Sequence, residues 1–188
     1  APFSVERTIT VDGGIGAFHY TMPLYFRQYA GQGERIALRM TGAPGAQSQA
    51  ELVYRDIDEI ERTVTADLTE SDTPGVYTGT LTVPEFAARL LSLKATLDTG
   101  EDAYEKEALR QPIPVGATAI AKLNGDASLP HDGLLTIWSA TARANQSVVL
   151  EGKTTIEFRG LPAATDYAFT LIGAGGVDLI AENPEPLP

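Results

Sequence analysis

The sequence contains no cysteine, which excludes disulfide bonds, thiolate metal sites and a cysteine nucleophile. Basic residues are also scarce, since 14 lysine and arginine side chains stand against 25 acidic ones, giving a formal net charge of -11. Such a field repels phosphate backbones, and no local basic cluster offsets it, so we do not expect nucleic-acid binding. No apolar run approaches the ~18 residues of a membrane-spanning helix, and no membrane insertion is expected.

Histidine is almost as rare, and this limits catalysis. A serine triad would need His19 or His131 beside a nucleophilic serine, and the sequence has no Gly-x-Ser-x-Gly elbow. His131 begins a turn-like His-Asp-Gly, and His19 falls on the outer face of an expected strand. We therefore expect a protein that is not an enzyme and needs no cofactor. A small hydrolase is a distant alternative.

What the chain does contain is alternation interrupted by turns. Twelve prolines and eighteen glycines are spread along it. Alternate apolar residues predict one long strand over 18–26, placed at an edge or bulge because Pro23 cannot donate to a ladder. Further short alternating runs follow, with one helical turn predicted over Glu85 to Leu90. Regularly spaced short strands of this kind predict an all-β fold.

A pause in the alternation suggests a domain boundary. Pro112 and Pro114 stiffen the chain in an extended form, as interdomain linkers often do. We therefore expect two tandem antiparallel β-sandwiches, over residues 1–112 and 116–182, followed by a Pro-rich tail over 183–188.

The segment from Gly160 to Tyr167 has the spacing of a tyrosine corner. In such a corner a tyrosine near the start of a strand turns its hydroxyl back to upstream backbone. Tyr167 is predicted to be largely buried in this way, with Trp138 in the same core.

Three stretches resemble known bacterial and fibronectin-type modules. Gly-Leu-Pro-Ala-Ala-Thr-Asp-Tyr at 160–167 resembles the corner of fibronectin type III domains, and Leu-Thr-Ile-Trp at 135–138 resembles their tryptophan-bearing strand. Residues 152–171 are equally similar to prealbumin-type repeats of bacterial surface proteins. Residues 72–100 resemble bacterial immunoglobulin-like domains. The resemblance implies an immunoglobulin-like domain and then a smaller fibronectin type III-like or prealbumin-like one, in an extracellular or periplasmic protein or in a virion.

Aromatic residues are concentrated between residues 18 and 29. One interpretation makes them core residues and their cover. The other takes Tyr25, Arg27 and Tyr29 as an exposed platform for a sugar ring or a protein partner, because such surfaces favour aromatic rings and arginine.

Two acidic groups are candidates for calcium. One comprises Asp98, Glu101 and Asp102, where Gly100 allows a sharp loop. The other lies within residues 56–61. Neither has the Asp-x-Asp-x-Asp-Gly spacing of a calcium loop, so we expect no metal and keep the first group as the weak candidate.

These observations favour a non-enzymatic structural or interaction module of a cell-surface, periplasmic or virion protein. It would act as a spacer or assembly element through a protein partner or self-assembly. The alternative is a carbohydrate-binding module that uses the aromatic segment 18–29.

Overall fold

The protein is built from β-strands alone in every part that the structure, a computed structural model, describes. The described residues are 14–25, 28–124, 133–173 and 178–181. The strands form three sheets, and all pairs are antiparallel except that between β3 and β11. The predicted all-β fold is confirmed.

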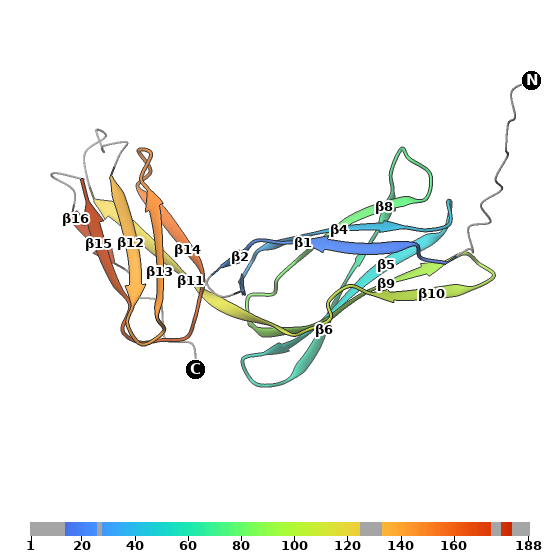
Figure 1. Cartoon of the computed structure of the whole chain (residues 1–188), viewed down its shortest axis with the longest axis horizontal. Helices are drawn as coiled ribbons and strands as arrows, with labels where there is room; N and C mark the ends of the chain where they lie inside the picture. Colours follow the sequence, from blue (N-terminus) through green and yellow to red (C-terminus); the bar gives the residue numbers. More distant parts are fainter. Residues whose placement is uncertain (1–13, 26–27, 125–132, 174–177, 182–188) are drawn as a thin grey trace, which may run out of the picture.

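The strands follow one another closely along the chain. In order they are β1 (Ala17–Thr21), β2 (Leu24–Tyr25), β3 (Tyr29–Gly31), β4 (Arg35–Thr41), β5 (Gln47–Asp56), β6 (Glu61–Asp67), β7 (Thr69–Glu70), β8 (Val76–Thr82), β9 (Ala87–Asp98), β10 (Ala103–Glu107), β11 (Ile113–Asn124), β12 (Leu134–Ser139), β13 (Ala144–Val149), β14 (Thr155–Leu161), β15 (Ala168–Ile172) and β16 (Asp178–Ala181). They gather into two groups that lie end to end and give the molecule an elongated shape (Figure 1).

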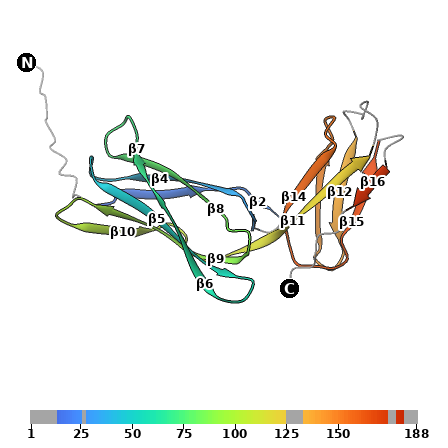
Figure 2. The same ribbon diagram turned by 180° about the vertical axis from the view of Figure 1, so that it is seen from behind.

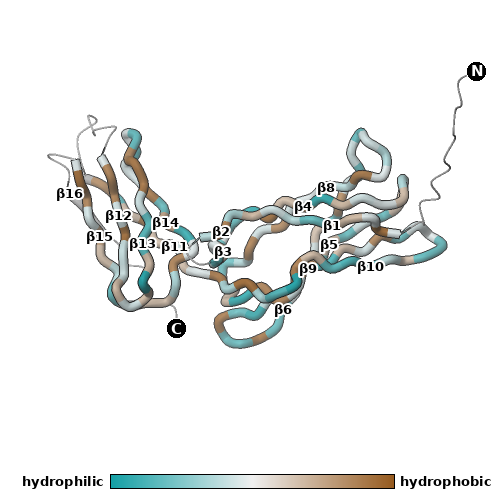
Figure 3. The backbone as a smooth tube through the Cα atoms, viewed as in Figure 1, coloured by the Kyte–Doolittle hydropathy of each residue, from teal (hydrophilic) through white to brown (hydrophobic). Residues whose placement is uncertain are grey.

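We call the two groups of strands the first and the second pack. The first pack, residues 14–115, encloses a core between two sheets. One sheet has the order β1-β4-β8-β7, and the other contains β3, β9, β5 and β6, with β10 added on β9. Along β4, Ile36, Leu38 and Met40 point inward and are buried, while the residues between them face water. This alternation recurs along the strands of both packs (Figure 3), and it is why these segments form half-buried strands.

Two sequence predictions for the first pack are wrong. The expected strand over 18–26 is broken, because β1 ends at Thr21 in one sheet and β2 begins at Leu24 in the other. Pro23 falls in the break, where no ladder hydrogen bond is needed from it. The expected helical turn is also absent, because strand β9 begins at Ala87 and pairs with β5 through most of its length.

The second pack, residues 117–181, has a separate core. Sheet β13-β12-β15 faces strands β14, β11 and β16. Phe158 and Ile137 are fully buried between them, and the Phe158 and Phe169 ring centroids are 5.9 Å apart. The prediction that Trp138 joins this core is wrong. Trp138 is 42% exposed, because Ile137 points inward and the next residue of a strand must point outward.

The tyrosine-corner hydrogen bond is confirmed. The Tyr167 hydroxyl donates to the carbonyl oxygen of Pro162 at 2.7 Å, and partial burial raises the Tyr167 pKa to about 12. The ring is only partly buried, so the predicted degree of burial was too high.

A second tyrosine, which sequence reasoning missed, ties a loop to the first core. Tyr77 is 1% exposed; its hydroxyl donates to the Ala43 carbonyl at 2.6 Å and accepts from the Ala46 amide at 3.0 Å. Its hydrogen-bond partners are more than thirty residues away in sequence, so no local sequence motif predicts these bonds.

The two tyrosines should differ in their response to loss of the hydroxyl. We expect Tyr77→Phe to lower the free energy of unfolding by about 2 kcal/mol, because it leaves a donor and an acceptor unpaired at a buried site. Tyr167→Phe should lower it by about 1 kcal/mol or less, because water can reach the Pro162 carbonyl. Urea denaturation of the two variants measures the difference, and equal losses would contradict this account.

Candidate functional site at the junction of the two packs

Strand β11 runs without interruption from the first pack into the second. Its start at Ile113 pairs with β9, Val115 and Gly116 pair with β3, and the following residues pair with β14 and then β16. Figure 2 shows the strand crossing between the packs from behind. The stretch over 112–116, which was expected to be a linker, is therefore hydrogen-bonded to the neighbouring strands β9 and β3. The division into two domains at this stretch stays a prediction.

Three glycines allow the backbones to approach closely at this crossing. Gly160 has φ 67° in an irregularity of the β11–β14 ladder, a left-handed conformation typical of a glycine bulge. A Cβ on Gly160 would lie 2.6 Å from Cβ of Tyr25, and a Cβ on Gly116 would collide with the backbone of Gly160. A Cβ on Gly31 would lie 3.0 to 3.2 Å from neighbouring side chains. Strand β14 is thus seated directly against β2 and β3.

A polar network joins the packs beside these glycines. The Tyr25 hydroxyl donates to Glu34 Oε1 at 2.5 Å. Arg159, on β14, places Nη1 3.5 Å from the same Glu34 oxygen and donates through Nε and Nη2 to Glu157 Oε2 at 3.0 and 2.7 Å. The Glu34 side chain is only 13% exposed, whereas Arg159 and Glu157 reach the surface. The network links Tyr25 and Glu34 in the first pack to Glu157 and Arg159 in the second, more than a hundred residues further along the sequence.

The environment of Tyr25 changes its ionisation. Burial and the hydrogen bond to Glu34 raise the Tyr25 pKa from 10.0 to about 12. Because the folded-state pKa is higher than the ordinary value, the neutral hydroxyl stabilises the fold below pH 10, and this contribution is lost as the pH rises toward 12.

Removing the charge of Glu34 should therefore lower the Tyr25 pKa. In Glu34→Gln we expect part of the tyrosinate absorbance change to move from near pH 12 toward pH 10, since both the carboxylate charge and its hydrogen bond raise the pKa. Tyr25→Phe identifies which part of the signal belongs to this residue. Glu59→Gln, at an exposed position in the first pack, is the control and should leave the titration unchanged. An unaltered curve in Glu34→Gln would contradict the assignment.

Two hollows share Phe86 as a lining residue, one beside the junction and the other beside the β5–β6 hairpin. One, of about 410 Å³, is lined by Gln32, Gly33, Glu85, Phe86, Thr118 and Arg159. The other, of about 460 Å³, is lined by Tyr54, Asp56, Ile57, Asp58, Arg62 and Phe86. Arg159 pairs with the Glu157 and Glu34 carboxylates, and Arg62 pairs through Nε with the Asp56 carboxylate.

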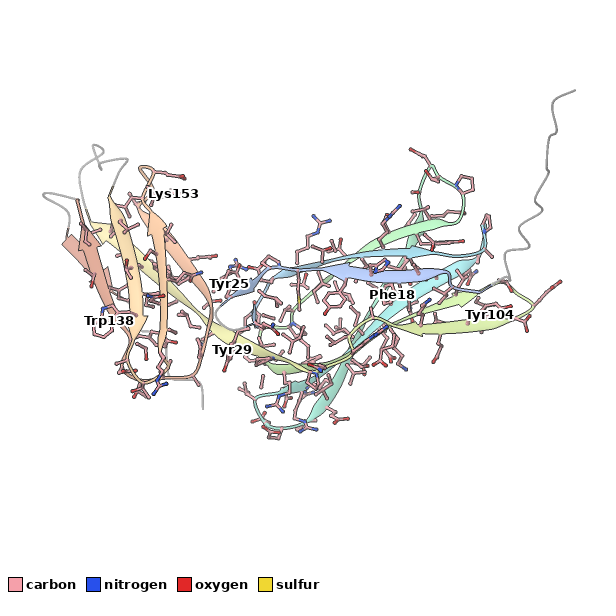
Figure 4. All side chains as sticks on the ribbon, in the orientation of Figure 1. Phe18, Tyr25, Tyr29, Tyr104, Trp138 and Lys153 are labelled. Atoms are coloured by element: carbon pink, nitrogen blue, oxygen red, sulfur yellow. The ribbon has the colours of Figure 1, made fainter. Side chains whose placement is uncertain are left out.

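Two of the three residues of the aromatic platform predicted from sequence lie in the described part of the chain. Tyr25 and Tyr29 are direct cross-strand partners of β2 and β3 and lie at the junction (Figure 4). Arg27 lies outside the described residues. Because the Tyr25 ring packs against Gly160 and its hydroxyl is held by Glu34, sugar binding at this place would compete with the junction contacts. That role stays a prediction.

The calcium candidates lie in the turn between β9 and β10. Asp98 Oδ1 accepts from the Gly100 amide at 2.8 Å, and Asp102 accepts from Thr99 through its main-chain oxygen at 3.0 Å. These bonds shape the turn. Among the described residues no three carboxylate or histidine side chains, Glu101 included, are gathered so as to hold a metal ion.

The other acidic group forms a different turn. Asp56 is buried, is paired with Arg62 and accepts from the amides of Asp58 and Ile60 at 3.0 and 2.9 Å. The Arg62 bond is the main reason why the Asp56 pKa is lowered. The carboxylate therefore organises the hairpin between β5 and β6. Glu59 and Glu61 pair with Arg55 on the surface.

The remaining candidates have no common location in the described chain. His19 is exposed on β1 opposite Arg39, while His131 and the Pro-rich tail 183–188 lie outside the described residues. No helix in the described part is long and apolar enough to cross a membrane.

Comparison with known proteins gives no relative for this chain. No protein-family model, curated protein or solved structure matches it.

Proposed function

We propose that this chain is a non-enzymatic structural module, a spacer or assembly element of a cell-surface, periplasmic or virion protein. The observation that carries the proposal is the junction. Two packs with separate cores are joined by one hydrogen-bonded strand, closed by glycine contacts and by the Tyr25–Glu34–Arg159 network. A spacer needs this property, because it must keep what lies at its two ends at a constant separation.

The burial of the junction adds support. Ordinary domain pairs in one chain are connected by exposed linkers and move relative to each other. Here the connecting residues Val115 and Gly116 pair with β3, and Val115 belongs to the buried core. Bending between the packs would break the contacts of β14 with β2 and β3 and the Arg159–Glu34 ion pair, so these contacts favour the resting geometry. The extracellular, periplasmic or virion setting rests on the resemblance to modules of such proteins, with a protein partner or a second copy at the ends.

Distance measurements between two spin labels test the spacer function. The chain has no cysteine, so Thr65→Cys on β6 and Thr155→Cys on β14 create the only labelling sites, both exposed. We expect one narrow distance distribution. Inserting Gly-Ser-Gly-Ser between Val115 and Gly116 should broaden it, which provides the matched control. A distribution as broad in the parent chain as in the insertion variant would refute a rigid spacer.

A further inference from the structure

The outer face of sheet β13-β12-β15 is free of charge. Strand register aligns its outward residues in three rows, each crossing the three strands. The rows are Val149, Leu134 and Ile172; Ser147, Thr136 and Thr170; and Asn145, Trp138 and Ala168. None of these nine residues is ionisable, on a chain whose net charge is -11. We call this surface the neutral face.

The neutral face differs from the other outward strand surfaces. On β6 and β10, for example, the exposed residues include Glu61, Asp67, Glu105 and Glu107. The first pack is contacted through β11 and β14, on the opposite sheet, so the neutral face is directed away from the junction. Figure 4 shows Trp138 on this outer part of the second pack. Three of the large apolar side chains that are exposed in the described residues, Trp138, Val149 and Ile172, lie on this one face, and such grouping favours a binding surface.

The three rows of the neutral face differ in the chemical character of their side chains. A row of hydroxyl groups lies between an aliphatic row and a row that holds the indole ring. The Thr136 and Ser147 hydroxyls are 2.8 Å apart, so one donates to the other and the pair keeps a donor and acceptor sites for a ligand. Asn145 adds an amide with donors and an acceptor.

We infer that the neutral face binds an uncharged oligosaccharide. A sugar ring has an apolar C–H face, which suits the electron-rich face of Trp138, and hydroxyl groups, which suit the Thr136–Ser147 pair and Asn145. No formal charge is present to select a charged ligand. This activity is additional to the spacer function and does not depend on it.

The size of the face argues against a second copy as the occupant. With strands ~4.8 Å apart and ~3.4 Å per residue, the nine side chains cover roughly 15 by 17 Å, or about 250 Å². A stable protein interface needs about 800 Å² on each partner. A chain of three or four sugar rings is of the required length, whereas a protein partner would extend onto the charged rim.

Affinity electrophoresis tests the inference. The acidic chain is run through native gels that contain dextran, mannan, xyloglucan or hydroxyethyl cellulose, each in a separate gel. We expect at least one polymer to slow the parent chain, Trp138→Ala to weaken this binding at least tenfold, and Trp138→Phe to keep part of it. Phe86→Ala removes an exposed aromatic ring of the first pack and should leave binding unchanged. Because Trp138 is the only tryptophan, its emission should shift to the blue as the ligand binds.

Three results would overturn the inference. The first is no retardation by any of the four polymers and no change in tryptophan emission. The second is equal retardation of the parent chain and Trp138→Ala. The third is concentration-dependent association of the parent chain in sedimentation that Trp138→Ala abolishes, since a second copy would then cover the face. Trp138 is half-exposed, so thermal unfolding should show that its variants remain folded.

Discussion

Replacing Gly160 by alanine is expected to lower the free energy of unfolding by about 3 kcal/mol, as measured in urea. A left-handed conformation costs an L-residue roughly 1–2 kcal/mol, and forcing a new methyl group into a filled space costs typically 1–3 kcal/mol. An alanine at position 160, where φ is 67°, incurs the first penalty, and the Tyr25 atoms 2.6 to 2.9 Å away from its Cβ impose the second.

Gly45 provides the matched control. It has φ 74°, and no atom lies within 4 Å of the position that its Cβ would take. Gly45→Ala should therefore show the conformational penalty alone, about 1 to 2 kcal/mol. The difference between the two variants measures the contact between the packs. Equal losses would mean that Tyr25 yields freely and that the junction is loose.

Replacing Phe158 by alanine is expected to remove about 3–5 kcal/mol from the second pack. The ring is fully buried and contacts the Phe169 ring, so its removal leaves a cavity at the centre of the smaller core. Small cores have little stability to lose, and we expect the second pack to unfold at a markedly lower temperature while the first pack remains folded. Scanning calorimetry should show one transition displaced and the other nearly in place.

Leu97→Ala is the counterpart in the first pack, where Leu97 is fully buried. It should displace the other transition by an amount typical of leucine truncation, about 2–5 kcal/mol. This pair of variants tests the predicted division into two domains. If each variant shifted a single common transition, the packs would form one cooperative unit and the two-domain interpretation would be wrong.

The sequence predicted the general architecture because alternation and turn residues are local signals. Most expected strands are present, and the Tyr167 bond to Pro162 follows from a motif only a few residues long. The errors have local causes as well. At Trp138 the residue type suggested the core, but the parity of β12 placed Ile137 there instead. At Met22 and Pro23 an alternating pattern continued across a point where the chain changes sheets.

The junction could not be predicted in the same way. Glu34 and Arg159 are separated by more than a hundred residues, and each alone resembles an ordinary surface charge. Gly160 was recognised only as part of a tyrosine corner, while its contact with Tyr25 depends on how β14 meets β2. Such contacts depend on the assembled fold, and a single sequence carries no signal for them.

The number of residues in strand β11 sets both the distance between the packs and the faces to which its side chains point. Its 12 residues measure roughly 40 Å at ~3.3 Å per residue, so each added residue would lengthen the connection between the packs by that rise. Because side chains alternate between faces, lengthening the strand by one residue would turn every later side chain to the opposite face, whereas two would preserve the faces and advance the second pack by one full repeat. Unless a bulge such as that at Gly160 absorbs the added residue, a change in length that keeps both faces in place therefore comes in steps of two residues.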